Sequence, residues 1–128
     1  MKLLALDTSA ATMSLALRHG EHVLEHTAVG GAQASLTLIA AVQDLMQRAG
    51  LRYEQLDAMV YGRGPGSFTG LRTACAVVQG LAFGGAVKVL PVDTLLAVAQ
   101  EARKQALQQG LDASRVLAAL DARMGEVY

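Results

Sequence analysis

Cysteine is nearly missing from this chain of 128 residues, since Cys75 is the only one. A single thiol excludes an intramolecular disulfide and fits a reducing compartment, so we expect a cytoplasmic protein. Tryptophan is absent and proline occurs only twice. The eleven basic and eleven acidic side chains cancel. The composition therefore lacks the basic excess that is typical of proteins that bind nucleic acid directly.

Long hydrophobic runs are also absent. The longest uncharged apolar stretch, Thr73 to Val87, is interrupted by Gln79 and is too short to cross a bilayer. The N-terminus leads at once into strand-like sequence and lacks the apolar region of a signal peptide. We therefore expect no membrane association.

Hydrophobic residues make up 52% of the chain, which is enough for a proper core, and their spacing alternates between strand and helix periods. Apolar runs predict strands over Lys2–Asp7, Met13–Arg18, His22–Ala28, Asp57–Gly62 and Val87–Val92. Helical spacing predicts helices over Ser35–Ala49, Thr69–Phe83 and Thr94–Gln109. Ser35 is the expected N-cap of the first helix and Gly50 its stop, while Gly84 and Gly85 are expected to end the second.

The order of these elements is β-β-β-α-β-α-β-α, which predicts a mixed sheet with helices packed on it. It is the order of one lobe of the ribonuclease-H-like or actin-like (ASKHA) fold. A further apolar strand over Arg115–Asp121 and a hairpin partner over Met124–Tyr128 would open a second lobe. We expect residues 1–112 to form the first lobe and residues 113–128 the opening strands of a second, truncated one.

A glycine-rich run, Tyr61 to Thr73, lies between the fourth strand and the second helix. Leu71 follows the last glycine where a P-loop has lysine, the spacing does not fit a dinucleotide fingerprint, and Ser67 lacks the flanking glycines of a nucleophile elbow. A tight turn before a helix N-terminus remains. It either binds an anion or is capped by Ser67 or Thr69 and packs closely, and the missing lysine favours the second alternative.

Asp7-Thr8-Ser9 ends the first strand. In actin-like folds this turn faces nucleotide phosphates, so the three residues are candidate binding residues for ATP or ADP with Mg²⁺. The alternative is an Asx-turn in which Asp7 only bonds its own backbone, and both remain open. An aspartic-protease element is disfavoured because Ser9 stands where that element has glycine.

The three histidines, His19, His22 and His26, lie on one predicted hairpin, and their spacing is too wide for an easy shared metal. Solvated side chains are the favoured interpretation. Cys75 lies in an apolar helix and is expected to be a small core residue. The same helix is apolar almost all round from Ala74 to Ala82, so a partner subunit is expected to cover its second face.

Three segments together resemble the TsaB (YeaZ) family of bacterial tRNA threonylcarbamoyladenosine biosynthesis proteins. They are Leu4 to Ser9, Tyr61 to Arg72 and Leu120 to Tyr128, and the last two are the most specific. The resemblance implies two actin-like lobes, of which this chain covers the first. It also implies a non-catalytic partner of the paralogue TsaD. With the ATPase TsaE, the pair places threonylcarbamoyl on the adenosine 3′ of the tRNA anticodon, and the synthase TsaC supplies the donor.

The resemblance further implies a dimer surface on the first two helices, shared by the TsaD heterodimer and a homodimer, with tRNA contacted only indirectly. The expected interface residues are Leu38, Val42, Leu45, Ala74, Val78 and Leu81. The family's glycine loop maps onto Gly64, Pro65, Gly66, Ser67, Phe68, Thr69, Gly70 and Arg72.

TsaD holds its metal partly through histidines on the first helix, whereas this chain has no histidine after Val29 and begins the helix with Ala34-Ser35. We therefore expect no catalytic residue and no metal site. Two other functions are the alternatives. One is an actin-like ATP-binding phosphotransferase or ATPase that uses Asp7, and the other, disfavoured, is a glycoprotease-like peptidase.

Overall fold

A computed structural model describes the backbone of all 128 residues and every side chain except those of Ala32 and Arg123. Five strands form one mixed sheet in the order β3-β2-β1-β4-β5. The strands are β1 (Lys2–Asp7), β2 (Thr12–His19), β3 (His22–Val29), β4 (Ala58–Gly62) and β5 (Val89–Val92). Neighbouring strands among β1, β2 and β3 pair antiparallel, whereas β4 pairs parallel with both β1 and β5. The predicted mixed sheet of a ribonuclease-H-like or actin-like lobe is confirmed.

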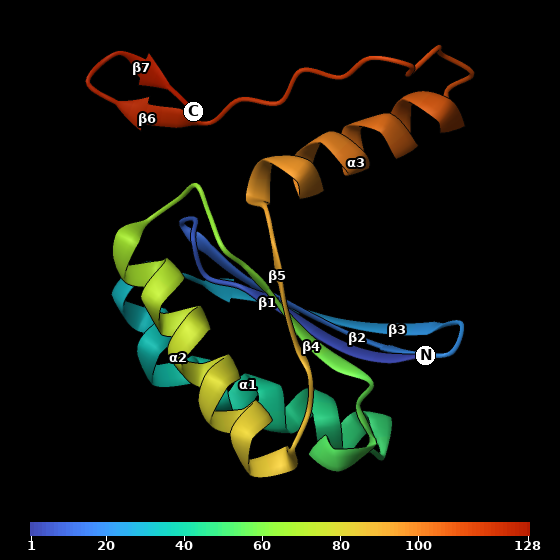
Figure 1. The fold of residues 1–128 in the computed structure, drawn as a ribbon, viewed down its shortest axis with the longest axis vertical. Helices are drawn as coiled ribbons and strands as arrows, with labels where there is room; N and C mark the ends of the chain where they lie inside the picture. The colour runs from blue at the N-terminus through green and yellow to red at the C-terminus, as the bar shows by residue number, and fades with distance from the viewer.

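The helices divide between the two sides of this sheet. Figure 1 shows α1 (Ala34–Ala49) and α2 (Phe68–Gly85) side by side on one side, and α3 (Thr94–Gln108) on the other. The chain beyond α3 lies on the same side as α3 and ends in a small separate sheet of β6 (Asp121–Arg123) and β7 (Glu126–Val127). No side chain of α3 is fully buried. One side of the sheet is therefore covered tightly and the other only in part.

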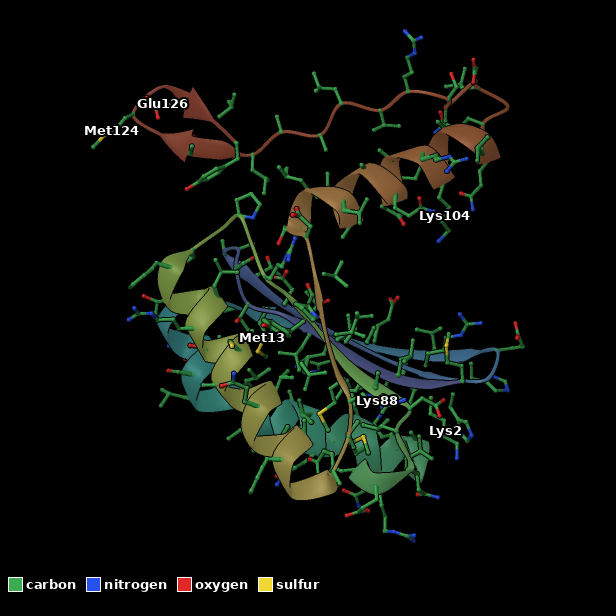
Figure 2. The ribbon with its side chains drawn as sticks, viewed as in Figure 1. Lys2, Met13, Lys88, Lys104, Met124 and Glu126 are labelled. Atoms are coloured by element: carbon green, nitrogen blue, oxygen red, sulfur yellow. The ribbon has the colours of Figure 1, made fainter. Side chains whose placement is uncertain are left out.

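The hydrophobic core lies between the sheet and the pair α1 and α2. Strand β1 runs through the centre of the sheet and contributes Leu4 and Leu6, while β2 contributes alternate residues, among them Met13, which lies between the sheet and α2 (Figure 2). Alternation places these side chains on one face because successive residues of a strand point to opposite faces. The two helices contribute core residues at helical spacing, including Leu38 on α1 and Val78 on α2.

The ends of two helices differ from the prediction. Helix α1 begins at Ala34, because a 3₁₀ turn over Gly31–Gln33 leads directly into it and the Ala34 N–H bonds back to Gly31. Ser35 therefore lies in the first turn and is not the N-cap. Helix α2 continues through Gly84 and Gly85 to a left-handed Ala86, because Gly85 is buried against Tyr53. Gly50 ends α1 in the left-handed conformation, as predicted.

The strand predicted over Arg115–Asp121 is wrong for most of its length. Residues 111 to 120 have no regular structure, and Leu117 is 96% exposed. Only Leu120 at its end is joined to the β6–β7 hairpin, through its carbonyl oxygen, which accepts from the Tyr128 N–H at 2.9 Å, and residues 111 to 119 pair with no strand. A short hairpin follows instead, turning at Met124 and Gly125, with Met124 pointing away from the body of the molecule (Figure 2).

The residues expected to contact a partner lie in the chain's own core. Five of them are fully or almost fully buried beneath the sheet, and Leu81 is half-buried against the same core; the five are Leu38, Val42, Leu45, Ala74 and Val78. Their apolar spacing marks the face of each helix that meets the sheet. Such side chains have almost no exposed area left to bury against a second protein. These residues are therefore core residues and not the predicted contacts with a partner.

Replacing Val78 by aspartate should unfold the chain, because an unpaired carboxylate would be buried under the sheet. We expect Val78→Asp to lower the free energy of unfolding by about 4 kcal/mol or more. Urea denaturation followed by circular dichroism measures this. Ala76→Asp, two residues away on the exposed face of α2, is the matched control and should change stability by only about 0.5 kcal/mol. Equal losses for both would contradict the assigned core.

Candidate functional site: the β1 turn and the glycine loop

The turn that follows β1 is closed by the Asp7 carboxylate. Its Oδ1 atom accepts hydrogen bonds from the Ser9 backbone N–H at 2.7 Å and from the Ser9 hydroxyl at 2.6 Å. This is the geometry of an Asx-turn. Oδ2 accepts no hydrogen bond from the described residues and lies against Gly62, and Asp7 is one of the residues that line a cavity. One oxygen of Asp7 thus holds the turn, and the other has no hydrogen-bond partner among the described residues.

The glycine loop fits directly onto this turn. The fully buried Thr8 hydroxyl donates to the carbonyl oxygen of Gly70 at 2.6 Å, and the Ser67 N–H donates to the carbonyl oxygen of Ser9 at 2.7 Å. A Cβ on Gly66 would stand 2.6 Å from that of Ser9, and a Cβ on Gly70 would overlap the Thr8 carbonyl oxygen. These two glycines are needed because a side chain at either position would collide with Thr8 or Ser9.

Ser67 is the N-cap of α2. Its hydroxyl accepts from the Gly70 N–H at 3.5 Å, and its carbonyl oxygen accepts from the Leu71 N–H at 2.9 Å. At the other end of the loop, Gly64 has φ +104°, which side chains rarely allow, and its carbonyl oxygen accepts from the Thr94 N–H at 2.8 Å. The loop thereby ties β4 both to α2 and to the start of α3.

The outer side of the loop is exposed. Phe68 and Thr69 face solvent at the start of α2, and the Arg72 guanidinium lies 3.9 Å from the centroid of the Phe68 ring. This cation–π contact holds two large side chains against each other at the surface. Pro65 is half-buried. The predicted loop residues thus divide into an inner set that packs against β1 and an outer set that remains accessible.

A cavity of about 390 Å³ opens on the side of the sheet opposite α1 and α2. Asp7 borders it together with Glu25, Thr27, Asp93 and Thr94. The sequence reasoning identified only Asp7 of these. Strand alternation was the available signal, because Glu25 and Thr27 stand on the face of β3 opposite the partly buried Leu24. The sequence did not reveal that these residues lie near Asp7, because that depends on the register of β3 and β1 on β2.

The other predicted residues take no part in a metal site in the described part of the chain, where no group of three histidine, cysteine or acidic side chains could hold a metal ion. The Cys75 thiol, half-buried, contacts the Tyr61 hydroxyl at 3.8 Å. This hydrogen bond, aided by burial, raises the pKa of Tyr61 above its ordinary value. No helix of the described residues is long and apolar enough to cross a membrane.

Comparison with known proteins identifies the family to which the chain belongs. Residues 25–128 match the family model described as "TsaD: tRNA N6-adenosine threonylcarbamoyltransferase". The sheet also resembles that of RuvC from Thermus thermophilus in complex with a Holliday junction substrate, at a TM-score of 0.56, 15% identity and coverage of 91% of this chain and 83% of that one. This second likeness shows the fold alone. The chain therefore belongs to the family of this threonylcarbamoyltransferase model and has a ribonuclease-H-like α/β fold.

Within that family the chain is similar over its whole length to proteins named TsaB, and over 70% of its length to a tRNA N6-adenosine threonylcarbamoyltransferase of Porphyromonas gingivalis, at 32% identity and 29% coverage of that protein. The tRNA threonylcarbamoyladenosine biosynthesis protein TsaB of Escherichia coli is 41% identical over 129 residues, covering 100% of this chain and 53% of its own length. YeaZ from Pseudomonas aeruginosa superposes with a TM-score of 0.82 at 45% identity, over 98% of this chain and 57% of that one. The predicted family is confirmed. The chain spans about half the length of the relatives that it matches.

Gly70→Ala tests whether the glycine loop needs its backbone contact with β1. A Cβ at this position meets the Thr8 carbonyl, which is backbone and cannot swing aside. We expect a loss of about 3 kcal/mol in the free energy of unfolding. Gly80→Ala in the same helix is the matched control, because nothing lies within 4 Å of its added Cβ, and it should stabilise the chain by about 0.5–1 kcal/mol. Chemical denaturation measures both, and a neutral Gly70→Ala would refute the contact.

Proposed function

We propose that this lobe belongs to a non-catalytic scaffold subunit for threonylcarbamoyladenosine formation in tRNA. It pairs with a TsaD-type transferase and, through it, with the ATPase TsaE, and it meets tRNA only indirectly. The names of the relatives support the pathway. The balanced charge of the chain supports indirect contact with tRNA, because direct binding draws on a surplus of lysine and arginine.

The observation that carries the proposal is the outward face of α2. Arg72 is the only charged residue of this 18-residue helix. Its exposed residues include Ala76, Gln79 and Gly80, and Phe83 is 91% exposed. A helix face with small uncharged residues allows another backbone to approach closely, and large exposed aromatic side chains are typical of interfaces.

Helix α1 extends this surface with exposed apolar side chains of its own. Leu36 is 79% and Ile39 is 47% exposed, although Leu38 between them is fully buried. A pair of helices packing on a similar pair would bury about 1,200–2,000 Å² in total, the size of a specific interface. The same surface serves a homodimer when the TsaD-type partner is absent. The proposed contact residues are therefore the outward positions of α1 and α2, in place of the core positions first predicted.

The contacts of the β1 turn and the glycine loop support a scaffold role rather than a catalytic one. Thr8, Ser67 and Gly70 use their hydrogen bonds to join β1 to α2. One oxygen of Asp7 is likewise used within its own turn. The glycine loop that identifies the family thus has a structural role in this chain. We propose that the residues that catalyse threonylcarbamoyl transfer belong to the transferase partner.

We further propose that residues 1–112 are the first lobe and that residues 113–128 open a second one, in a cytoplasmic protein. The relatives' greater length supports this division. The separate β6–β7 sheet also supports it, because an isolated two-stranded hairpin is marginally stable and needs further strands or a helix to pack on.

A nucleotide-binding role through Asp7, Thr8 and Ser9 is the second candidate, since Asp7 lines the cavity. Glu25 and Asp93 border it too, and no lysine or arginine side chain is among its lining residues. The described lining therefore offers no basic side chain to pair with the phosphates of a nucleotide. We expect calorimetry with ATP and Mg²⁺ to show no micromolar binding. Micromolar binding that disappears in Asp7→Ala would establish the nucleotide site instead.

The proposed interface is tested by placing one charge on it. Ala76→Asp leaves the fold intact by the argument above, yet it buries an unpaired carboxylate when a partner covers α2. We expect at least ~10-fold weaker binding to the TsaD-type partner. Calorimetry or co-purification with that partner measures the loss. Ala102→Asp on the exposed side of α3 is the control and should bind normally. Unchanged binding by Ala76→Asp would rule out this face.

A further inference from the structure

The side of the sheet opposite α1 and α2 carries the cavity described above, which we call the trough. The strand register determines which residues form its floor. Two rows of residues cross the strands side by side on this face. One row is Glu25, Ala16, Ala5 and Val60, and the other is Thr27, Ser14 and Asp7, whose carboxylate lies against Gly62. The small side chains at the centre of both rows leave the hollow of about 390 Å³. This volume is in the range of small-molecule sites.

The walls of the trough accept hydrogen bonds and carry negative charge. Asp7 and Glu25 line it without a salt bridge to any described residue, and Asp93 lies 3.8 Å from the Arg63 guanidinium. The Thr94 hydroxyl oxygen is buried without a hydrogen-bond partner among the described residues, and it lies on the same side of Gly62 as Oδ2 of Asp7, because a Cβ added to Gly62 would meet both atoms. The trough therefore complements a group that donates several hydrogen bonds and is positively charged.

The two free carboxylates lie at opposite ends of an apolar floor. Glu25 stands on β3 and Asp7 on β1, two strands apart and displaced by two residues along the strands. Strand spacing and rise put their Cα atoms about 12 Å apart, too far for one metal ion to bind both. Ala5 and Ala16 occupy the space between them. The arrangement fits an elongated molecule that is charged at both ends and aliphatic in the middle.

We propose that this trough binds a linear aliphatic diamine of the putrescine or cadaverine class. One ammonium group donates to Oδ2 of Asp7 and, after rotation of Thr94 about its Cα–Cβ bond, to the Thr94 hydroxyl. The methylene chain lies over Ala5 and Ala16, and the second ammonium group pairs with Glu25. The site lies on the opposite side of the sheet from the outward faces of α1 and α2, so it does not depend on the proposed interface.

Titration calorimetry of the full chain at low ionic strength tests the proposal with putrescine and with n-butylamine, which has one ammonium group. Putrescine should bind more tightly to the unchanged chain. Glu25→Gln should weaken putrescine about fivefold and leave n-butylamine unchanged, because it removes only the second ion pair. Asp7→Asn should weaken both ligands, and the carbonyl oxygen of its amide still accepts the Ser9 hydrogen bonds that hold the turn.

Glu21→Gln is the matched control, since Glu21 lies in the β2–β3 turn outside the trough. It should bind putrescine as the unchanged chain does, and thermal melting of each variant verifies folding. Three results overturn the proposal: no binding of putrescine, equal affinity for putrescine and n-butylamine, or full putrescine affinity in Glu25→Gln. Equal affinities would mean a single-ended site of the kind that a lysine side chain of another protein also fits.

Discussion

The packing of the β1 turn against the start of α2 is the contact on which the rest of the lobe depends. The buried hydroxyl of Thr8 and the backbone of Ser9 meet a loop that has no side chain at Gly66 or Gly70. This contact fixes where α2 begins and how far along β1, the central strand, the helix is placed. Since α1 packs beside α2, it also determines how the whole covered face of the sheet is filled.

The same turn lies between the two sides of the sheet, for which we propose different roles. On the covered side, α1 and α2 complete the core with their inner faces and present small and apolar residues outward, where we place the partner. On the open side, Asp7 and the small residues of β1 and β2 border a polar trough. A single turn thus uses one oxygen of Asp7 for structure, and the other is the oxygen that we propose for ligand binding.

The error about the interface residues shows the limit of periodicity. Leu38, Val42 and Val78 recur at helical spacing, and this correctly identifies a buried face. Periodicity does not identify what covers that face, because a sheet and a partner protein select the same apolar residues. The strand predicted over Arg115–Asp121 failed for a related reason, since an apolar run becomes a strand only where a neighbour accepts its backbone hydrogen bonds.

The sequence by itself determined the element order, the mixed sheet and the family, because hydrophobic periods and the glycine-rich run are local properties of the chain. It also located Asp7 and Ser67, whose roles as turn and cap residues act within a few positions. Only the tertiary structure decided that Gly66 and Gly70 contact β1, that the predicted interface positions are core, and that Glu25 shares a trough with Asp7. Those facts depend on register and on distances between segments far apart in the chain, which no local pattern encodes.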